Sequence, residues 1–318
     1  MSQVPSRDAT LVADLSHNAL VAVSGDDAAA FLHAQFTNDV LALEAGTAQW
    51  SSWLSAKGRI LATFLLVRRS DHYLMMLPAE LAAPILKRLS MFVLRSKVKL
   101  EDASARLARL GIAGPNAAAI VATHWGSAPA PMRSVERDAG LVVGLDAGRF
   151  VVIAPASHAS AIREKFASTE SAGAEAWEAA AIRAGIPTVL AATQEAFIPQ
   201  MVNFELIGGV SFKKGCYPGQ EIVARTHYRG GLKRRMAMAH IAGDEAPKPG
   251  DAIYSTAFGE QAAGQVANAA PAPGGGFDTL VVAQLESLAS NDLHWKTPGG
   301  PTLEIRELPY AVPKPGPG

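Results

Sequence analysis

The order of strand-like and helix-like segments constrains the fold of this chain most, and that order changes near residue 231. Before that point, apolar runs typical of strands alternate with segments that have the spacing of one helical face. Residues 60–67 form an almost unbroken hydrophobic run that predicts a central strand, and residues 79–93 predict a helix. The helical pattern places Phe92 on the buried face and makes Met91 core filler. The whole order of elements occurs twice, which predicts an α+β fold of two related halves.

The segment after residue 231 has a different character, with short strand-like runs between Gly/Pro clusters. These runs are residues 236–241, 252–255, 264–267, 280–285 and 302–305. Such spacing is typical of a small β-barrel. We therefore expect two domains, residues 1–230 and a C-terminal barrel in residues 231–318, with a disordered tail over residues 312–318.

Composition excludes several classes of protein. Lys+Arg and Asp+Glu both number 29, so the net charge is zero; we do not expect direct nucleic-acid binding, although a local basic patch stays open. The N-terminus has no secretory or transit pattern, and no run approaches the roughly 20 apolar residues of a membrane helix. A cytoplasmic protein without a membrane contact is expected.

Metal and disulfide chemistry within the chain are also not expected. The 318 residues hold one cysteine, which excludes an intrachain disulfide and a self-sufficient iron–sulfur site. The 8 histidines are scattered without the spacing of metal ligands. We expect no metal site.

The single cysteine, Cys216, lies in a stretch unlike core material. Lys213 and Lys214 precede it, and nearby cations favour the reactive thiolate. Pro218 and Gly219 are the central residues that a type II turn requires. The stretch predicts a presented, functional thiol; the alternative is a small buried hydrophobe, the commonest fate of a free cysteine.

Basic residues follow the thiol closely and include Arg225, Arg229, Lys233, Arg234 and Arg235, with His227 and Tyr228 between them. This stripe is either a solvated connection into the barrel or an anion site. An anion site could receive the carboxylates of a folate tail or the phosphates of RNA.

Several motifs together resemble one family. They are KGCYPGQE at residues 214–221, Gly-Ile-Pro at 185–187, Phe-Ile-Pro-Gln at 197–200 with Asn203, GGVSF at 208–212, FLHAQFTNDV at 31–40 and Lys-Gly-Arg-Ile at 57–60. In their order along the chain, these motifs are similar to those of the YgfZ family, folate-binding proteins of iron–sulfur cluster maturation and tRNA modification. That family is related in fold to the glycine-cleavage aminomethyltransferase.

The resemblance implies that tetrahydrofolate, or a one-carbon derivative, lies in a channel between the two halves and the barrel. The residues that it assigns to the channel wall are Asn38, Asp39, Arg183, Gln200, Asn203 and Phe212. The amides of Gln200 and Asn203 offer donors and acceptors to a pterin edge, and Phe212 offers a stacking face. The alternative for the two amides is that they brace a loop.

One departure concerns catalysis. The aminomethyltransferases place a catalytic aspartate in the strand after the turn glycine, whereas this chain has no acid in residues 58–63. Their pterin-contacting glutamate corresponds to Arg183. We therefore do not expect aminomethyl transfer, because both carboxylates are missing.

The expected function is that of a folate-binding accessory protein for iron–sulfur cluster assembly and tRNA modification. Cys216 would be its working thiol, activated by Lys214. The surrounding motif of Gly215, Tyr217, Gly219, Gln220, Glu221 and Arg225 would position the thiol or dock a partner. The expected partners are iron–sulfur proteins or assembly factors, bound transiently, and tRNA-modifying enzymes. The alternatives are a folate-dependent one-carbon transferase or demethylase and, third, an RNA-binding module.

Overall fold

The computed structural model describes residues 9–138, 140–166 and 169–313, and the predicted tail is thus described only at residues 312 and 313. By their contacts, residues 1–51 and 64–177 form one compact unit, and residues 52–63 and 178–318 form a second. Each unit is described by itself. This grouping reports which residues pack together, so the domain boundary at residues 230 and 231 stays a prediction.

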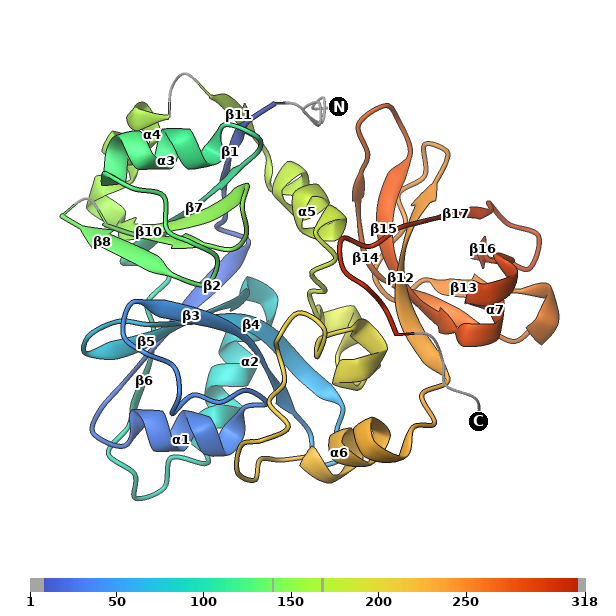
Figure 1. Cartoon of the computed structure of the whole chain (residues 1–318), viewed down its shortest axis with the longest axis horizontal. Helices are drawn as coiled ribbons and strands as arrows, with labels where there is room; N and C mark the ends of the chain where they lie inside the picture. The colour runs from blue at the N-terminus through green and yellow to red at the C-terminus, as the bar shows by residue number, and fades with distance from the viewer. Residues whose placement is uncertain (1–8, 139, 167–168, 314–318) are drawn as a thin grey trace. The chain divides into compact units, whose positions relative to one another are not determined.

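The first unit contains a six-stranded sheet in the order β11-β1-β7-β10-β9-β8. Its strands are β1 (Leu11–Asp14), β7 (Leu107–Ala113), β8 (Ser134–Arg137), β9 (Gly140–Gly144), β10 (Arg149–Pro155) and β11 (Glu170–Ala172). Helices α3 (Ala117–Trp125) and α4 (Ala159–Lys165), the latter preceded by the 3-10 turn η1 (Ala156–His158), cover one face (Figure 1). Trp125 and Phe166 stack with ring centres 6.1 Å apart in the core between these helices and the sheet.

A five-stranded sheet follows the order β3-β4-β5-β2-β6. Its elements are β2 (Asn18–Ser24), α1 (Ala28–Gln35), β3 (Thr47–Leu54), β4 (Ile60–Arg68), β5 (His72–Pro78), α2 (Ala79–Ser90) and β6 (Lys99–Asp102). β4 lies inside the sheet and its first eight residues are buried, so the predicted central strand is confirmed. The hairpin end of β3 and β4, residues 52–63, groups with the second unit.

Helix α2 ends three residues earlier than the sequence predicted. Leu81, Ile85 and Leu89 are buried as expected, but Met91 is 63% exposed and Phe92 is 43% exposed. The prediction that these two residues fill the core is wrong. Residues 91–96 form turns instead, and Leu94 has a φ of +47°, which a right-handed helix does not accommodate.

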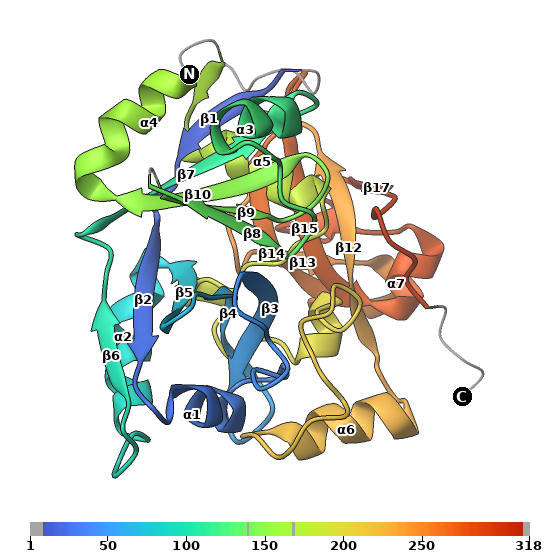
Figure 2. The same cartoon turned by 60° about the vertical axis from the view of Figure 1, so that its left-hand side comes forward.

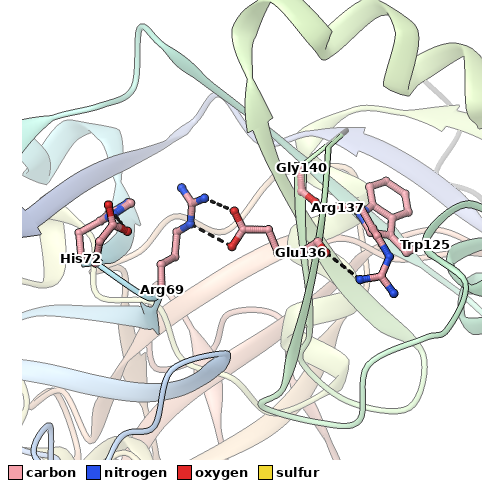
Figure 3. A network of polar contacts seen from close by, with 7 residues as sticks. Arg69, His72, Trp125, Glu136, Arg137 and Gly140 are labelled. Carbon is pink, nitrogen blue, oxygen red and sulfur yellow. Dashed lines mark hydrogen bonds and ion pairs between the residues drawn. The ribbon is translucent and has the colours of Figure 1, made fainter.

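Polar contacts also connect elements of the first unit (Figure 3). Arg69, directly after β4, donates to both carboxylate oxygens of Glu136 on β8. Both side chains are partly exposed, and such pairs contribute only about 0–1 kcal/mol. The indole N–H of Trp125 donates to the Gly140 carbonyl at 3.1 Å, which satisfies a polar group of a buried ring.

The second unit contains a curled six-stranded sheet in the order β16-β13-β14-β15-β12-β17. Its elements are β12 (Arg234–Ile241), β13 (Ala252–Tyr254), η4 (Thr256–Phe258), β14 (Gly264–Pro271), β15 (Phe277–Gln284), α7 (Leu285–Ser290), β16 (His294–Trp295) and β17 (Leu303–Arg306). The sheet encloses its own apolar core, which includes Ile241, Val281 and Trp295. The predicted small C-terminal barrel is confirmed, with β16 as a strand that the sequence did not indicate.

The segment between α5 (Ala174–Arg183) and the barrel carries most of the family motifs. It contains the 3-10 turns η2 (Ala191–Thr193) and η3 (Pro199–Val202), followed by the helix α6 (Gln220–Arg229). Figure 2 shows α6 at the end of a long loop, directly before the chain enters β12. Among the helices of the described ranges, none has the length and apolarity to cross a membrane.

Close packing against a glycine gives a test of the first unit. A Cβ added to Gly111 of β7 would lie 2.4 Å from a ring carbon of Trp177, which is 4% exposed. Gly111→Ala should therefore destabilise the fold by about 1–3 kcal/mol, the usual cost of overpacking. Denaturant unfolding measures this loss. Gly173→Ala, where a Cβ meets nothing within 4 Å, is the control. Equal stability of the two variants would contradict the close packing of Trp177 against Gly111.

Candidate functional site

The turn that follows Cys216 is built as the sequence predicted. Gly219 has φ +76° and ψ +3°, close to the values of the third residue of a type II turn. The N–H of Gln220 donates to the carbonyl of Tyr217 at 3.2 Å, which closes the turn. α6 begins at Gln220, so the turn sets the start of the helix.

This turn rests directly against a second glycine turn, between β3 and β4. A Cβ on Gly219 would lie 2.5 Å from the Ser55 carbonyl oxygen and 2.7 Å from the Cα of Gly58. A Cβ on Gly58, whose φ is +70°, would lie 2.8 Å from the Cβ of Ile222 in α6. Two motifs that are far apart in the sequence, residues 57–60 and 214–221, therefore meet backbone to backbone.

The thiol is presented to solvent between two anchored side chains. Cys216 is exposed, so the alternative of a small buried hydrophobe is wrong. Lys214 is 8% exposed and its ammonium lies 4.8 Å from the ring centre of Tyr217, within the range of a cation–π contact. Tyr217 is 7% exposed, and burial raises its pKa to about 12. Activation of the thiol by Lys214 stays a prediction.

The remaining residues of the thiol motif lie on the loop and on α6. Gly215 is exposed directly before the thiol. Gln220 is half-buried at the first position of α6, and Glu221 is exposed in its first turn, where the helix dipole favours an acid. Arg225 is exposed one helical turn after Glu221.

Arg235 does not belong to an exposed basic stripe, which corrects the sequence prediction. Its side chain is 8% exposed and forms an ion pair with Glu205 at 2.8 Å. It also donates to the Gln200 carbonyl at 2.8 Å and to the side-chain oxygen of Asn203 at 3.0 Å. Arg234, beside it on β12, is half-buried. A β-strand turns alternate residues to opposite faces, so a run of adjacent cations need not form one surface.

Burial dominates the electrostatics of the Arg235 cluster. Burial raises the pKa of Glu205, and the neighbouring Arg235 guanidinium partly offsets that rise. Both bonds from Arg235 reach one carboxylate oxygen, Oε1, and the other oxygen is buried without a hydrogen-bond partner among the described residues. The stability of a fold with such a buried carboxylate depends on the cation that pairs with it.

The amides assigned to the folate wall both brace the loop. Nε2 of Gln200 donates to the Val223 carbonyl of α6 at 2.7 Å. Nδ2 of Asn203 donates to the Met236 carbonyl of β12 at 3.0 Å, while its Oδ1 accepts from Arg235. The bracing alternative thus applies to both residues. Oε1 of Gln200 is nevertheless buried without a hydrogen-bond partner in the described structure, which leaves one acceptor for a ligand.

Arg183 and Phe212 lie in the same unit as these amides. Arg183 ends α5 and forms an ion pair with Asp278 of β15 at 3.8 Å. The ring of Phe212 stacks on His227 of α6, with centres 3.7 Å apart and an angle of 15°. One face of Phe212 is therefore occupied by a protein ring.

Asn38 and Asp39 lie in the other unit, after α1. Nδ2 of Asn38 donates to the Trp50 carbonyl at 2.8 Å. Oδ1 of Asp39 lies 3.2 Å from Nδ1 of His33. The predicted wall residues thus divide between the two units, and their assembly into one folate channel stays a prediction.

The second unit contains a pocket of about 740 Å³ that no sequence pattern indicated. Its lining combines one residue run from β12, one from α7 and the chain from Ile305 to Pro313. The pocket forms where three segments that are separated in the sequence pack together, and a local sequence pattern does not predict such packing. Within the described residues, no three His, Cys, Asp or Glu side chains gather as metal ligands would.

Comparison with known proteins first defines the class. Residues 5–135 match the GCVT N-terminal domain family. The fold is similar to the crystal structure of glycine cleavage system aminomethyltransferase T from Bartonella henselae, with a TM-score of 0.70 at 17% identity over 96% of this chain and 87% of that chain. The chain therefore has the aminomethyltransferase-like fold.

Curated relatives then define the family. The tRNA-modifying protein YgfZ of Cronobacter sakazakii (strain ATCC BAA-894) is 32% identical over 310 residues, covering 92% of this chain and 91% of the relative. The tRNA-modifying protein YgfZ of Shigella dysenteriae serotype 1 (strain Sd197) is 30% identical over 237 residues, covering 73% of this chain and 72% of the relative. The chain belongs to the YgfZ family, as its motifs indicated.

Gly219→Ala tests the contact between the two glycine turns. Gly126→Ala is the matched control, because Gly126 has φ +78° and open space around it. The control should lose about 1–2 kcal/mol from the left-handed backbone alone. Gly219→Ala should lose a further 1–3 kcal/mol or so from the clash and should alter the rate at which Cys216 reacts with a thiol reagent. Equal losses on denaturant unfolding, with unchanged thiol reactivity, would contradict the contact.

Arg235→Met tests the buried ion pair. Removal of the cation leaves the Glu205 carboxylate unpaired and should cost about 3–5 kcal/mol near neutral pH, whereas Arg235→Met with Glu205→Leu should recover most of it. Without Arg235 the pKa of Glu205 rises further, so the native state holds the proton more tightly than the unfolded state. Stability of the single variant should then fall as pH rises from the ordinary value of 4.5 through the raised pKa.

Urea unfolding of wild type and both variants at pH 5 and pH 8 measures these effects. The double variant is the control for the pH dependence, because it has no carboxyl group at residue 205. The stability loss of Arg235→Met relative to wild type should be larger at pH 8 than at pH 5. An equal or smaller loss at pH 8 would show that Arg235 does not stabilise the Glu205 carboxylate.

Proposed function

We propose that this protein is a tetrahydrofolate-binding accessory protein that supports iron–sulfur cluster assembly or repair and tRNA modification through the thiol of Cys216. The observation that carries the proposal is the exposed Cys216 on a turn held by two facing glycines. A thiol in a fixed and solvent-facing position can be reached by a partner, as a reactive cysteine must be. The name of its relatives, tRNA-modifying protein YgfZ, supports the tRNA part of the role.

The thiol can act on a partner in two ways. As a thiolate, Cys216 would attack a disulfide of the partner and form a mixed disulfide, while the other sulfur leaves as a thiolate. It could instead donate one ligand to a cluster whose other ligands the partner supplies. Both routes require an accessible sulfur, and both make the interaction transient. We place this activity in the cytoplasm, with iron–sulfur proteins, assembly factors and tRNA-modifying enzymes as partners.

Folate binding is supported by the family resemblance and by one feature of Gln200. A pterin presents N–H donors along its edge, and the unpartnered Oε1 of Gln200 is a buried acceptor that such a donor would satisfy. Asn203 offers less, because both ends of its amide already bond the protein. Gln200 is therefore the residue that we expect to hold the ring, and Asn203 the residue that orders its loop.

A folate-dependent one-carbon transferase or demethylase is the alternative, and the local chemistry disfavours it. The start of β4 carries Thr63 rather than an acid, and its hydroxyl bonds the Val189 N–H at 3.0 Å. Arg183 pairs with Asp278 and supplies no carboxylate to a ligand. Without an acid at either position, the chain lacks the group that would orient or protonate an amine. Turnover of a one-carbon unit by the purified protein would favour the alternative.

Cys216→Ser separates the thiol from folate binding. Calorimetric titration with tetrahydrofolate should give the same affinity within about twofold for wild type and variant, because serine is close in size and the side chain is exposed. The variant should fail to complement a bacterial strain that lacks its own YgfZ protein. Thermal unfolding is the control and should not change.

The folate part and the thiol part of the proposal can be contradicted separately. Absence of tetrahydrofolate binding in the wild type would remove the folate part of the proposal. Complementation by Cys216→Ser would remove the thiol part.

A further inference from the structure

His227 and Tyr228, both exposed on the second half of α6, pack with Phe212 of the preceding loop. Phe212 stacks on His227, and Tyr228 meets both rings edge to face, at 6.5 Å and 4.8 Å between centres. The stack fixes the rings of Phe212 and His227, and Tyr228 beside them is 71% exposed. An exposed tyrosine held by neighbouring rings offers a flat surface at little cost in side-chain entropy.

Exposed cations lie close to these rings along the chain. Lys213, Arg225, Arg229 and Lys233 are all exposed, and none lies within 4.0 Å of a carboxylate among the ion pairs of the described residues. Arg225 and Arg229 are four residues apart on α6, so they share one face of the helix. Glu221 is the acid on that face, one turn before Arg225 and at the other end of the helix. The positive charge is thus local, which the zero net charge of the chain conceals.

We propose that this surface, Phe212, Lys213, Arg225, His227, Tyr228, Arg229 and Lys233, binds a single-stranded segment of RNA. Tyr228 stacks on an unpaired base, and the arginine and lysine side chains contact the phosphates on either side. The inference rests on the proposed function and names the RNA as a direct partner of the same site. It departs from the expectation, drawn from the zero net charge, that the chain does not bind nucleic acid directly.

The chemistry of the surface favours RNA over the other anions considered for this segment. A folate tail consists of glutamate units, which would use the cations but carry no ring to stack on an exposed tyrosine. A single strand uses both features, because each nucleotide brings a phosphate and a flat base. A duplex hides its bases in the stack, so it would use the cations alone.

The position of the surface relates it to the thiol. α6 begins four residues after Cys216, and Tyr228 is eight residues further along the helix. At 1.5 Å per residue, Tyr228 lies about 12 Å along the helix axis from Gln220. An RNA strand on this surface would therefore lie within about one helix length of the thiol turn.

Fluorescence anisotropy with a labelled single-stranded RNA of twelve nucleotides, over a series of salt concentrations, tests the proposal. Tyr228→Ala should weaken binding about tenfold and Tyr228→Phe should not, because the ring alone stacks. Arg225→Gln with Arg229→Gln should weaken binding and lower the slope of log K against log salt by about 1.4, since each phosphate contact on a single strand contributes roughly 0.7. Duplex RNA of the same sequence should bind more weakly.

The matched control is Lys87→Gln with Arg95→Gln, which removes two exposed cations from the other unit. Equal weakening by the control would overturn the proposal, as would a wild type that does not bind the strand at low salt. Loss of complementation by Tyr228→Ala with RNA binding unchanged would overturn it in favour of a protein partner.

Titration of the wild type with tetrahydrofolate separates this inference from the proposed function. Folate binding and a Cys216-dependent complementation without RNA binding would remove the inference alone. RNA binding with the predicted variant effects but without folate binding would sustain the inference and remove the folate role.

Discussion

The close approach of two glycine backbones is the constraint on which the candidate site depends. No side chain larger than hydrogen fits at Gly219, because the Ser55 carbonyl and the Gly58 Cα occupy the space. This contact joins the hairpin end of β3 and β4 to the turn after the thiol and fixes where α6 begins. The positions of Cys216 and of the buried Tyr217 follow from it, because both lie within three residues of Gly219. The cations on α6 follow too, because they lie on the helix that begins at Gln220.

A second constraint orders the long loop between α5 and the barrel. That loop has few regular hydrogen bonds, and Arg235 compensates by contacting three of its residues, Gln200, Asn203 and Glu205. A guanidinium suits this role because it presents five donors in a rigid plane. The loop is thereby tied to the first residues of β12, and the family motifs in it acquire fixed positions although its regular structure consists of short 3-10 turns.

Local patterns predicted the parts of the molecule that local chemistry determines. Residues 60–67 are hydrophobic enough to be a central strand in any context, and Pro218-Gly219 requires a turn wherever it lies. The failures occurred where a distant contact or a local conformation overrides the pattern. Phe92 has the right helical spacing, but Leu94 takes a positive φ and the helix has already ended. In the sequence, Arg235 resembles a further surface cation. In the structure it is buried, because it pairs with Glu205, thirty residues earlier.

The same division applies to the candidate site. The exposure of Cys216 followed from its polar neighbours, and the sequence alone sufficed to predict it. The hydrogen bonds of Gln200 and Asn203 could not be predicted from the sequence, because an amide in a loop can bond the protein or a ligand equally well. Their partners, the Val223 and Met236 carbonyls, lie on α6 and β12, and only the folded chain brings them together.

The solitary, solvent-facing sulfur also determines how this protein responds to oxidants. Oxidation of Cys216 would produce a sulfenic acid, which is ordinarily rescued by a neighbouring resolving thiol. These 318 residues contain no second cysteine, so no such rescue can occur within the chain. The reducing equivalent must come from a separate molecule, either a low-molecular-weight thiol or a thiol of another protein. Recovery of the reduced thiol is therefore bimolecular, and its rate is set by the thiol pool around the protein rather than by the fold.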